Sequence, residues 1–255
     1  NKSMANGNSA QYVTAIGASS LTSNTGNYNT ALGYGTMSIN TSGFENAAVG
    51  ANAMSGNTNG DRNVAVGFES LLFNSSTSEL TALGYHSLRD NTSGVGNTGV
   101  GFASLRDNST GNYNTAVGHA SLIVNTGSNN TASGYQALNS NTSGHDNSAI
   151  GYFALKNNDL GWGNVSIGSL AMEDNTGGFN NVAIGESALL NLTSGEGNVA
   201  IGSGAFSTTG AFDICTSIGY NAGGGHGNST ALGYATILSA SDQIRLGNSL
   251  VTSIS

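Results

Sequence analysis

The most regular feature of the sequence is a short apolar pattern that recurs along almost the whole chain. Thr or Val is followed by a small residue, an aliphatic residue and a glycine, as in Thr115-Ala116-Val117-Gly118. Such alternation, rich in β-branched residues, is typical of a short strand. The glycine, called here the anchor glycine, returns after 17 residues at most steps, after 16 at two steps and after 14 at the last two. The anchor glycines are Gly17, Gly33, Gly50, Gly67, Gly84, Gly101, Gly118, Gly134, Gly151, Gly168, Gly185, Gly202, Gly219, Gly233 and Gly247.

A second apolar position lies four residues after the anchor glycine and is usually Leu or Met, as at Leu88 and Leu122. We expect a second short extended segment around it. The residue directly after the anchor glycine is often aromatic, as at Tyr85 and Phe102. Like side chains one coil apart would form ladders at the strand spacing of roughly 4.8 Å.

The remaining positions of each repeat are polar and are typical of turns. Asn-Thr-Ser-Gly occurs at residues 40–43, 91–94 and 141–144, and both Asn and Gly tolerate left-handed backbone conformations. A further Asn lies four residues before most anchor glycines, as at Asn114. We predict that these Asn side chains point inward and form a ladder that satisfies backbone groups of successive coils.

Self-similarity at a short fixed period predicts a solenoid. One coil has three or four apolar side chains to bury, at roughly 1.5–3 kcal/mol each, which is less than the cost of ordering its backbone, so coils must stack. The predicted fold is all-β, a parallel β-solenoid or β-roll of about fifteen coils of 14–17 residues. Residues 1–219 carry the 17-residue repeat, and residues 220–255 carry the 14-residue coils and a C-terminal junction segment.

The two faces of each predicted strand differ in the size of their side chains. One face bears the β-branched and aliphatic pair, and the other bears Ala and the anchor glycine. We place the aliphatic pair in the core and interpret the Ala and Gly face as packing against another copy of the chain. Val117→Asp is therefore predicted to break coil stacking and to lower the melting temperature, whereas Arg89→Ala is not.

Composition and charge narrow the function. The chain has 39 Gly, no Pro, 8% charged residues and a net charge of -8. Six Lys and Arg cannot cover the phosphates of a nucleic acid, and the negative sign disfavours an anionic membrane surface. No apolar run approaches the roughly 18 residues of a membrane span, so we expect no membrane insertion. Cys215 is the single Cys, which excludes an intrachain disulfide.

Several strings resemble a known family. Asn114–Gly118 and Asn198–Gly202, read Asn-Thr-Ala-Val-Gly and Asn-Val-Ala-Ile-Gly, resemble the head repeats of YadA-like trimeric autotransporter adhesins. The longer form with Gly-Tyr-x-Ala-Leu and Asn-Thr-Ser-Gly is similar to repeats of tail-fibre-like proteins of phages and bacteria. Residues 241–255 resemble the segment that precedes an endosialidase-type intramolecular chaperone in such fibres. The resemblance implies a parallel β-roll, three chains side by side, and a role in attachment at a cell surface or on a virion fibre, outside the cell.

The chemistry of a catalytic or metal site is not evident in the sequence. Glu69 and His86 share a column in adjacent coils, and we interpret them as an exposed ladder contact rather than a catalytic pair. The repeated Leu-Arg-Asp-Asn at 88–91 and 105–108 is interpreted as a solvated, mixed-charge patch. The segment 223–227 lacks the Asp of calcium-binding β-roll repeats. We expect no enzyme activity, no cofactor and no metal site.

The sharpest binding candidates are aromatic residues in the turn before the Asn column, because the turns are otherwise polar. Such rings can stack on sugar rings or pack as rigid anchors on a neighbouring subunit, and both uses remain open. These residues are Tyr28, Phe44, Tyr113, Trp162, Phe179 and Phe212.

The sequence thus predicts a structural and adhesive segment of a homotrimeric surface or tail fibre, which attaches to a host cell through a surface glycan or protein. Two alternatives belong to other classes. An ice- or crystal-binding solenoid needs a flat exposed Thr array, and the Thr column before the anchor glycine is interrupted by Val64, Val165, Val182 and Val199. A polysaccharide-degrading fibre needs acid pairs in a groove, and the 14 Asp and Glu are scattered over the coils.

Overall fold

The computed structural model describes residues 10–251 and contains strands, turns and no helix in that range. The predicted all-β, parallel β-solenoid is confirmed, with about 14 turns in the structure. The chain divides into two compact units, Asn1–Asn129 and Asn130–Ser255. Each unit is described by itself.

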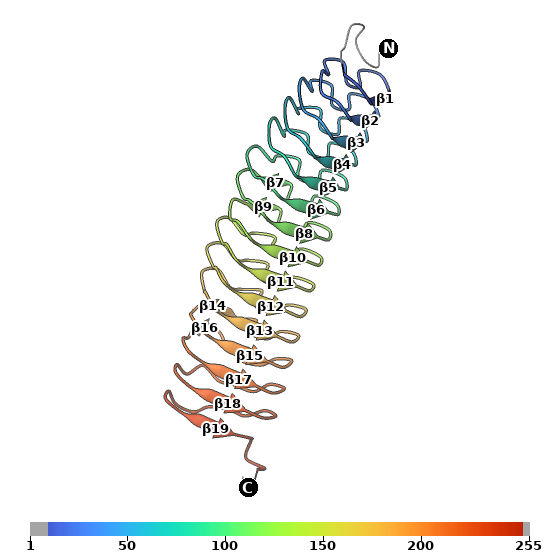
Figure 1. Ribbon diagram of the computed structural model, residues 1–255. Helices are drawn as coiled ribbons and strands as arrows, with labels where there is room; N and C mark the ends of the chain where they lie inside the picture. Colours follow the sequence, from blue (N-terminus) through green and yellow to red (C-terminus); the bar gives the residue numbers. More distant parts are fainter. Residues whose placement is uncertain (1–9, 252–255) are drawn as a thin grey trace. The chain divides into compact units, whose positions relative to one another are not determined.

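The first unit carries a parallel sheet of three-residue strands, one per turn (Figure 1). Each strand pairs in register with the strand one turn later, so that Thr30, for example, lies opposite Ala47. A short parallel pair, β7 (Asp107–Asn108) and β9 (Val124–Asn125), forms on another side of the turns (Figure 1). The sheet strands are β1 (Thr14–Ile16), β2 (Thr30–Leu32), β3 (Ala47–Val49), β4 (Val64–Val66), β5 (Thr81–Leu83), β6 (Thr98–Val100) and β8 (Thr115–Val117).

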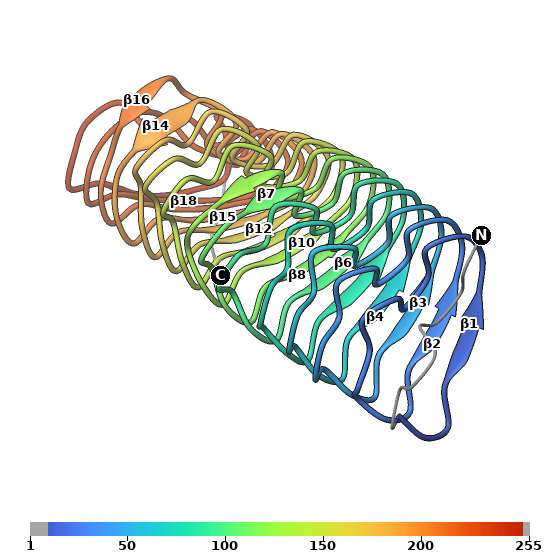
Figure 2. The same cartoon turned by 90° about the horizontal axis from the view of Figure 1, so that it is seen from above.

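The second unit repeats this arrangement. Its short additional pair is β14 (Leu192–Ser194) with β16 (Gly210–Ala211). Figure 2 shows how the chain turns back after each strand to begin the next coil. The sheet strands are β10 (Thr131–Ser133), β11 (Ser148–Ile150), β12 (Val165–Ile167), β13 (Val182–Ile184), β15 (Val199–Ile201), β17 (Thr216–Ile218), β18 (Thr230–Leu232) and β19 (Ile244–Leu246).

The core of each coil is thin. The central Ala of the strand is fully buried, as at Ala82 and Ala183, and so is the Leu or Met four residues after the anchor glycine, as at Leu88 and Leu189. These two apolar positions, together with a small residue just before the Leu, fill the space between opposite walls of the coil. Leu contributes the bulk, and Ala leaves room for it.

The prediction of which strand face is buried is wrong. The Ala face lies inside, whereas the aliphatic residue before the anchor glycine is exposed: Val117 is 41% exposed and Ile184 is 37% exposed. The coil is too narrow for a branched side chain on the strand to fit opposite the buried Leu. Val117→Asp would therefore change the outer surface of the strand and leave the core of the coil unaltered.

The second apolar position is also formed differently from the prediction. Leu88 does not lie in an extended segment: its φ is 50°, in the left-handed region. The residue two positions earlier, His86, has a φ of 55°, so the chain bends sharply twice just after the anchor glycine. This tight double bend sends the Leu side chain inward and closes the coil.

The predicted Asn ladder before the strands is confirmed. In the second unit, the backbone N–H of Asn164 donates to Oδ1 of Asn147 at 3.0 Å, and Asn147 Nδ2 donates to the carbonyl of Gly161 at 2.8 Å. The Asn of the Asn-Thr-Ser-Gly turns forms a further buried ladder, in which Asn158 Nδ2 donates to Asn141 Oδ1 at 2.6 Å. Both ladders satisfy polar groups that the narrow core would otherwise bury unpaired.

Candidate functional site

The six aromatic candidates lie in the turn that leads into the buried Asn ladder, called here the Asn corner and made of the three residues before each ladder position. Tyr28 and Tyr113 directly precede Asn29 and Asn114, and both have left-handed φ, 58° and 55°. The other four stand one or two residues earlier in the same turn. They are Phe44, Trp162, Phe179 and Phe212.

Several of these rings are stacked on their equivalents in neighbouring turns. In the first unit, Tyr12 and Tyr28 have ring centroids 4.9 Å apart and nearly parallel planes. In the second unit, Trp162 stacks on His145 at 5.7 Å and on Phe179 at 4.9 Å. The spacing of the coils therefore sets the distance between the rings. Within a stack both faces of a ring are covered, so an open face remains only on the last ring of the stack.

The six rings differ in exposure. Tyr28 is 55% exposed and Tyr113 is 64% exposed, whereas Phe179 and Phe212 are half-buried, and Phe212 also meets the buried Phe206 edge-on at 5.7 Å. Phe212 packs inside its own chain, where it covers the coil that has Gly223 in place of the buried Leu. The remaining five rings present at least part of their surface to solvent.

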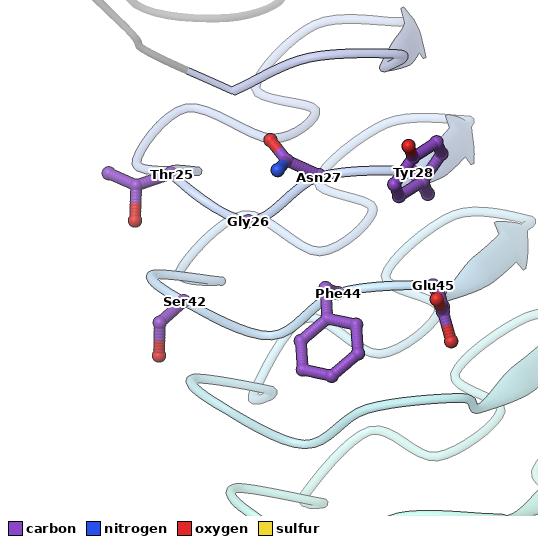
Figure 3. Close-up of a pocket in the computed structure, with 7 residues that line it drawn as sticks. All are labelled: Thr25, Gly26, Asn27, Tyr28, Ser42, Phe44 and Glu45. Atoms are coloured by element: carbon purple, nitrogen blue, oxygen red, sulfur yellow. The ribbon is translucent and has the colours of Figure 1, made fainter.

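Two shallow pockets lie at the Asn corner, one in each unit. The pocket of the first unit has a volume of about 420 Å³, and Figure 3 shows Phe44 between Ser42 and Glu45, below Asn27. The pocket of the second unit has a volume of about 430 Å³. The first is lined by Thr25, Gly26, Asn27, Tyr28, Ser42, Phe44 and Glu45. The second is lined by Gly177, Phe179, Ser194, Gly195, Glu196, Ala211 and Asp213.

The carboxylates and hydroxyls of these pockets were not among the predicted site residues. Glu45 follows Tyr28 in the same column one turn later, and Glu196 follows Phe179 in the same way. Across the described residues, neither carboxylate has a hydrogen bond or an ion pair. Aligning the coils on the anchor glycine already brings each Glu beside its aromatic residue, so this signal was present in the sequence.

A cluster of charged side chains lies elsewhere in the first unit. Nε2 of His86 lies 2.9 Å from Oε2 of Glu69, so the predicted contact between them is confirmed. Arg89 approaches Glu69 at 3.4 Å, and Arg106 forms a bidentate pair with Asp107, with both distances 2.7 Å.

Two groups of this cluster have shifted pKa values. Partial burial raises the pKa of the Asp90 carboxyl above 3.8, and the neighbouring Asp107 raises it further, against the opposing charge of Arg89. The hydrogen bonds to Asp107 raise the pKa of Arg106, which stays charged. The arrangement is a set of ion pairs on a half-exposed surface, as the mixed-charge pattern predicted.

The strands carry a row of exposed apolar side chains in each unit. This apolar stripe consists of the two outward residues of each sheet strand and the residue after the anchor glycine. Aromatic members stack along it: Tyr85 lies 5.2 Å from Phe102, and Tyr135 lies 5.5 Å from Tyr152. Exposed aliphatic members are Ile16, Leu32, Val64, Val66, Leu83 and Val117 in the first unit, and Ile150, Ile167, Ile184, Ile201, Ile218, Ile244 and Leu246 in the second.

Between residues 10 and 251, no three His, Cys, Asp or Glu side chains come together in an arrangement that could hold a metal ion. The same part of the chain offers no helix of the length and apolarity that a bilayer crossing requires.

Comparison with known proteins adds no family assignment. No protein-family model matches the chain, and no curated protein sequence is significantly similar to it.

Proposed function

We propose that the chain is a structural and adhesive segment of a homotrimeric fibre that attaches to a host cell or to a surface glycan. The observation that carries the proposal is the apolar stripe. Contiguous exposed apolar surface on a soluble protein marks a contact surface, and here every turn contributes to it. The role is one of binding without catalysis, outside the cell, at a cell surface or on a virion fibre.

A second copy of the chain suits the stripe better than an unrelated partner. The stripe repeats once per turn, so an identical solenoid presents matching rows at the same spacing of roughly 4.8 Å. Its members are aliphatic and aromatic residues interspersed with Thr and Ser, and Glu186 is the one carboxylate among its described members, so the stripe has the low charge of permanent subunit interfaces. The resemblance to trimeric adhesin heads and tail-fibre repeats supports three copies rather than two.

The mass of the assembly tests this proposal. We expect light scattering to give a mass near three times 25.5 kDa for the parent chain. Ile167→Glu combined with Ile184→Glu places two charges on the stripe and should lower the mass to that of one chain, with an unchanged circular dichroism spectrum. The matched control is Thr176→Glu with Thr193→Glu, two exposed positions outside the apolar stripe, which should remain assembled. A monomeric parent chain would contradict the proposal.

A second candidate function, binding to ice or to a crystal surface, is favoured by one observation. An exposed Thr row, distinct from the interrupted Thr column of the strands, follows the inner Asn ladder of the turns. Its hydroxyls donate to the backbone one turn later, as from Thr41 to Thr58 at 2.8 Å and from Thr92 to Ser109 at 2.8 Å. The hydroxyl hydrogens are therefore already engaged, which weakens this candidate. Thermal hysteresis of the purified chain would support it, and its absence would dismiss it.

A further inference from the structure

The two pockets lie at the same corner of the repeat, but their groups do not occupy identical positions. Each combines an aromatic ring, a Glu that follows the ring in its column one turn later, and a Ser four residues before the buried Asn of that later turn. The rings are Tyr28 and Phe179, the carboxylates are Glu45 and Glu196, and the hydroxyls are Ser42 and Ser194. Tyr28 and Glu45 directly precede a buried Asn, whereas Phe179 and Glu196 stand two residues before one.

An open aromatic face is available in both pockets because the stack of rings ends there. Tyr28 ends the stack with Tyr12, and the next residue of its column is Glu45. Phe179 ends the stack with Trp162, and the next residue of its column is Glu196. In each unit, therefore, an aromatic ring faces a turn that offers a carboxylate in place of another ring.

The backbone holds these groups in place. The N–H of Phe44 donates to Oδ1 of Asp61 at 3.0 Å, and the N–H of Glu196 donates to Oδ1 of Asp213 at 2.9 Å. These Asp side chains brace the corner from the following turn, so the pocket is shaped before any ligand arrives. The carboxylates of Glu45 and Glu196 have no partner among the described residues and can accept hydrogen bonds from a ligand.

The chemistry of the lining selects the class of ligand. An aromatic face packs against the apolar C–H face of a sugar ring, and carboxylate, hydroxyl and amide groups bond its hydroxyls. Among the described residues, no Lys or Arg lines either pocket, and the net charge of -8 opposes a sialylated or sulfated saccharide. A quaternary ammonium ion would use the ring and the carboxylate, but it could not use the hydroxyl and amide groups of Ser42 and Asn27.

We propose that the Asn corner of each unit holds a binding site for an uncharged saccharide, with Tyr28 or Phe179 stacked on the sugar ring and Glu45 or Glu196 accepting hydrogen bonds from its hydroxyls. The proposal deepens the proposed attachment function and depends on it for its biological role. A shallow pocket of this size takes one or two sugar rings, so each site binds weakly. Strong attachment then comes from several sites acting together.

Saturation-transfer difference NMR of the full chain tests the proposal. The probes are glucose, galactose, mannose and N-acetylglucosamine, with N-acetylneuraminic acid and tetramethylammonium as competing classes. We expect signal from at least one neutral sugar at millimolar concentration and none from the other two probes. Tyr28→Ala with Phe179→Ala should weaken binding by at least about tenfold, because both stacking faces are removed. Glu45→Gln with Glu196→Gln should weaken it less, because the amide still accepts one hydrogen bond.

The matched control is Phe73→Ala, which removes an exposed ring of the first unit outside the corner and should leave sugar binding unchanged. Absence of binding by all four neutral sugars would overturn the proposal, as would unaltered binding by the Tyr28 and Phe179 double variant or a preference for either competing probe. Light scattering on the same samples keeps the two proposals apart. A trimer without sugar binding contradicts the saccharide site alone, and a monomer that binds sugar contradicts the trimeric fibre alone.

Discussion

Three residues of most turns adopt the left-handed backbone conformation, and glycine is not required at these positions. Two of the three positions follow the anchor glycine, as at His86 and Leu88. The third directly precedes the buried Asn, as at Tyr113 in the following coil. Each costs on the order of 1 kcal/mol for a residue with a side chain. Hydrogen bonds to the neighbouring turns and burial of the Leu offset that cost, so the conformation depends on stacking rather than on local preference.

The anchor glycine differs, because its φ and its surroundings both exclude a side chain. Gly84 has a φ of 140°, and a Cβ there would lie 2.6 Å from the carbonyl carbon of Gly101. We expect Gly84→Ala to destabilise the chain by about 3 kcal/mol or more, from backbone strain and separation of the turns. Thermal unfolding followed by circular dichroism measures the effect. Gly177→Ala is the control, since an added Cβ meets nothing within 4 Å, and it should leave the melting temperature within about a degree. Equal losses in both variants would contradict this account.

Asp90 gives the structure a predictable pH dependence. Its pKa is raised in the folded state, so the folded chain holds this proton more tightly than the unfolded chain, and the associated stability is lost as the pH rises through the folded pKa. At pH 7 the ionised, half-buried carboxylate of Asp90 lowers the free energy of unfolding, and Asp90→Asn removes this cost. The gain is at most about 1 kcal/mol, because the side chain is 35% exposed and its ion pairs are screened.

The gain should shrink as the pH falls through the folded pKa and vanish below 3.8, where Asp90 is protonated in both states. Melting temperatures of the parent and variant between pH 3.5 and pH 8 measure it. Glu45→Gln, an exposed position outside the apolar stripe and without side-chain partners among the described residues, supplies the control for a lost negative charge. A stability difference for Asp90→Asn that is the same at every pH would show that the carboxyl's titration is not its source.

At the scale of elements, the strands were predictable in position but not in orientation. The alternation shows that Val182 and Ile184 share a face and that Ala183 lies on the other, but it does not say which face is inside. Bulky apolar residues are usually buried, and this expectation failed because the opposite wall contributes a Leu that fills the narrow coil. The left-handed φ of Leu88 was also not predicted, because a residue with a side chain disfavours this backbone conformation when only its local sequence is considered. The Asn corner was found from its aromatics, but Glu45 and Glu196 were overlooked because each was considered within its own coil.

The Asn ladder is the element whose loss should cost most per atom removed. Asn147 is fully buried, accepts the N–H of Asn164 and donates to the carbonyl of Gly161. Asn147→Ala leaves the N–H of Asn164 unpaired, at about 1–3 kcal/mol, and removes one of the two donors to the Gly161 carbonyl, which keeps Nδ2 of Asn158. We expect a loss of about 2 kcal/mol or more in denaturant unfolding. Asn59→Ala removes an exposed amide whose side chain accepts one hydrogen bond, from Thr58, and should cost less than about 0.5 kcal/mol. Similar losses for the two variants would argue against the ladder as a source of stability.

At the scale of the whole molecule, a solenoid is stabilised by interactions between neighbouring turns, so complete turns are interchangeable units. Deleting residues 151–167 joins Ile150 to Gly168, which occupies the same position as Gly151 in the repeat. Strand β11 would then pair with β13 in place of β12, with Ser148 opposite Val182 and Ala149 opposite Ala183, and both Asn ladders would remain continuous. We expect this variant to fold, with a melting temperature a few degrees below that of the parent.

Deleting residues 151–159 is the matched test, because it removes fewer residues but leaves a coil too short to return to the strand. The strands would lose their register, and the Asn ladders would be interrupted at a buried position, where unpaired amides are costly. We therefore expect the shorter deletion to be the more damaging, with loss of the β spectrum and of the cooperative transition. If damage instead followed the number of residues removed, the second unit would be held together by contacts beyond adjacent turns. The repeat would then be a feature of the sequence of this unit, and its stability would not be a sum of contacts between adjacent turns.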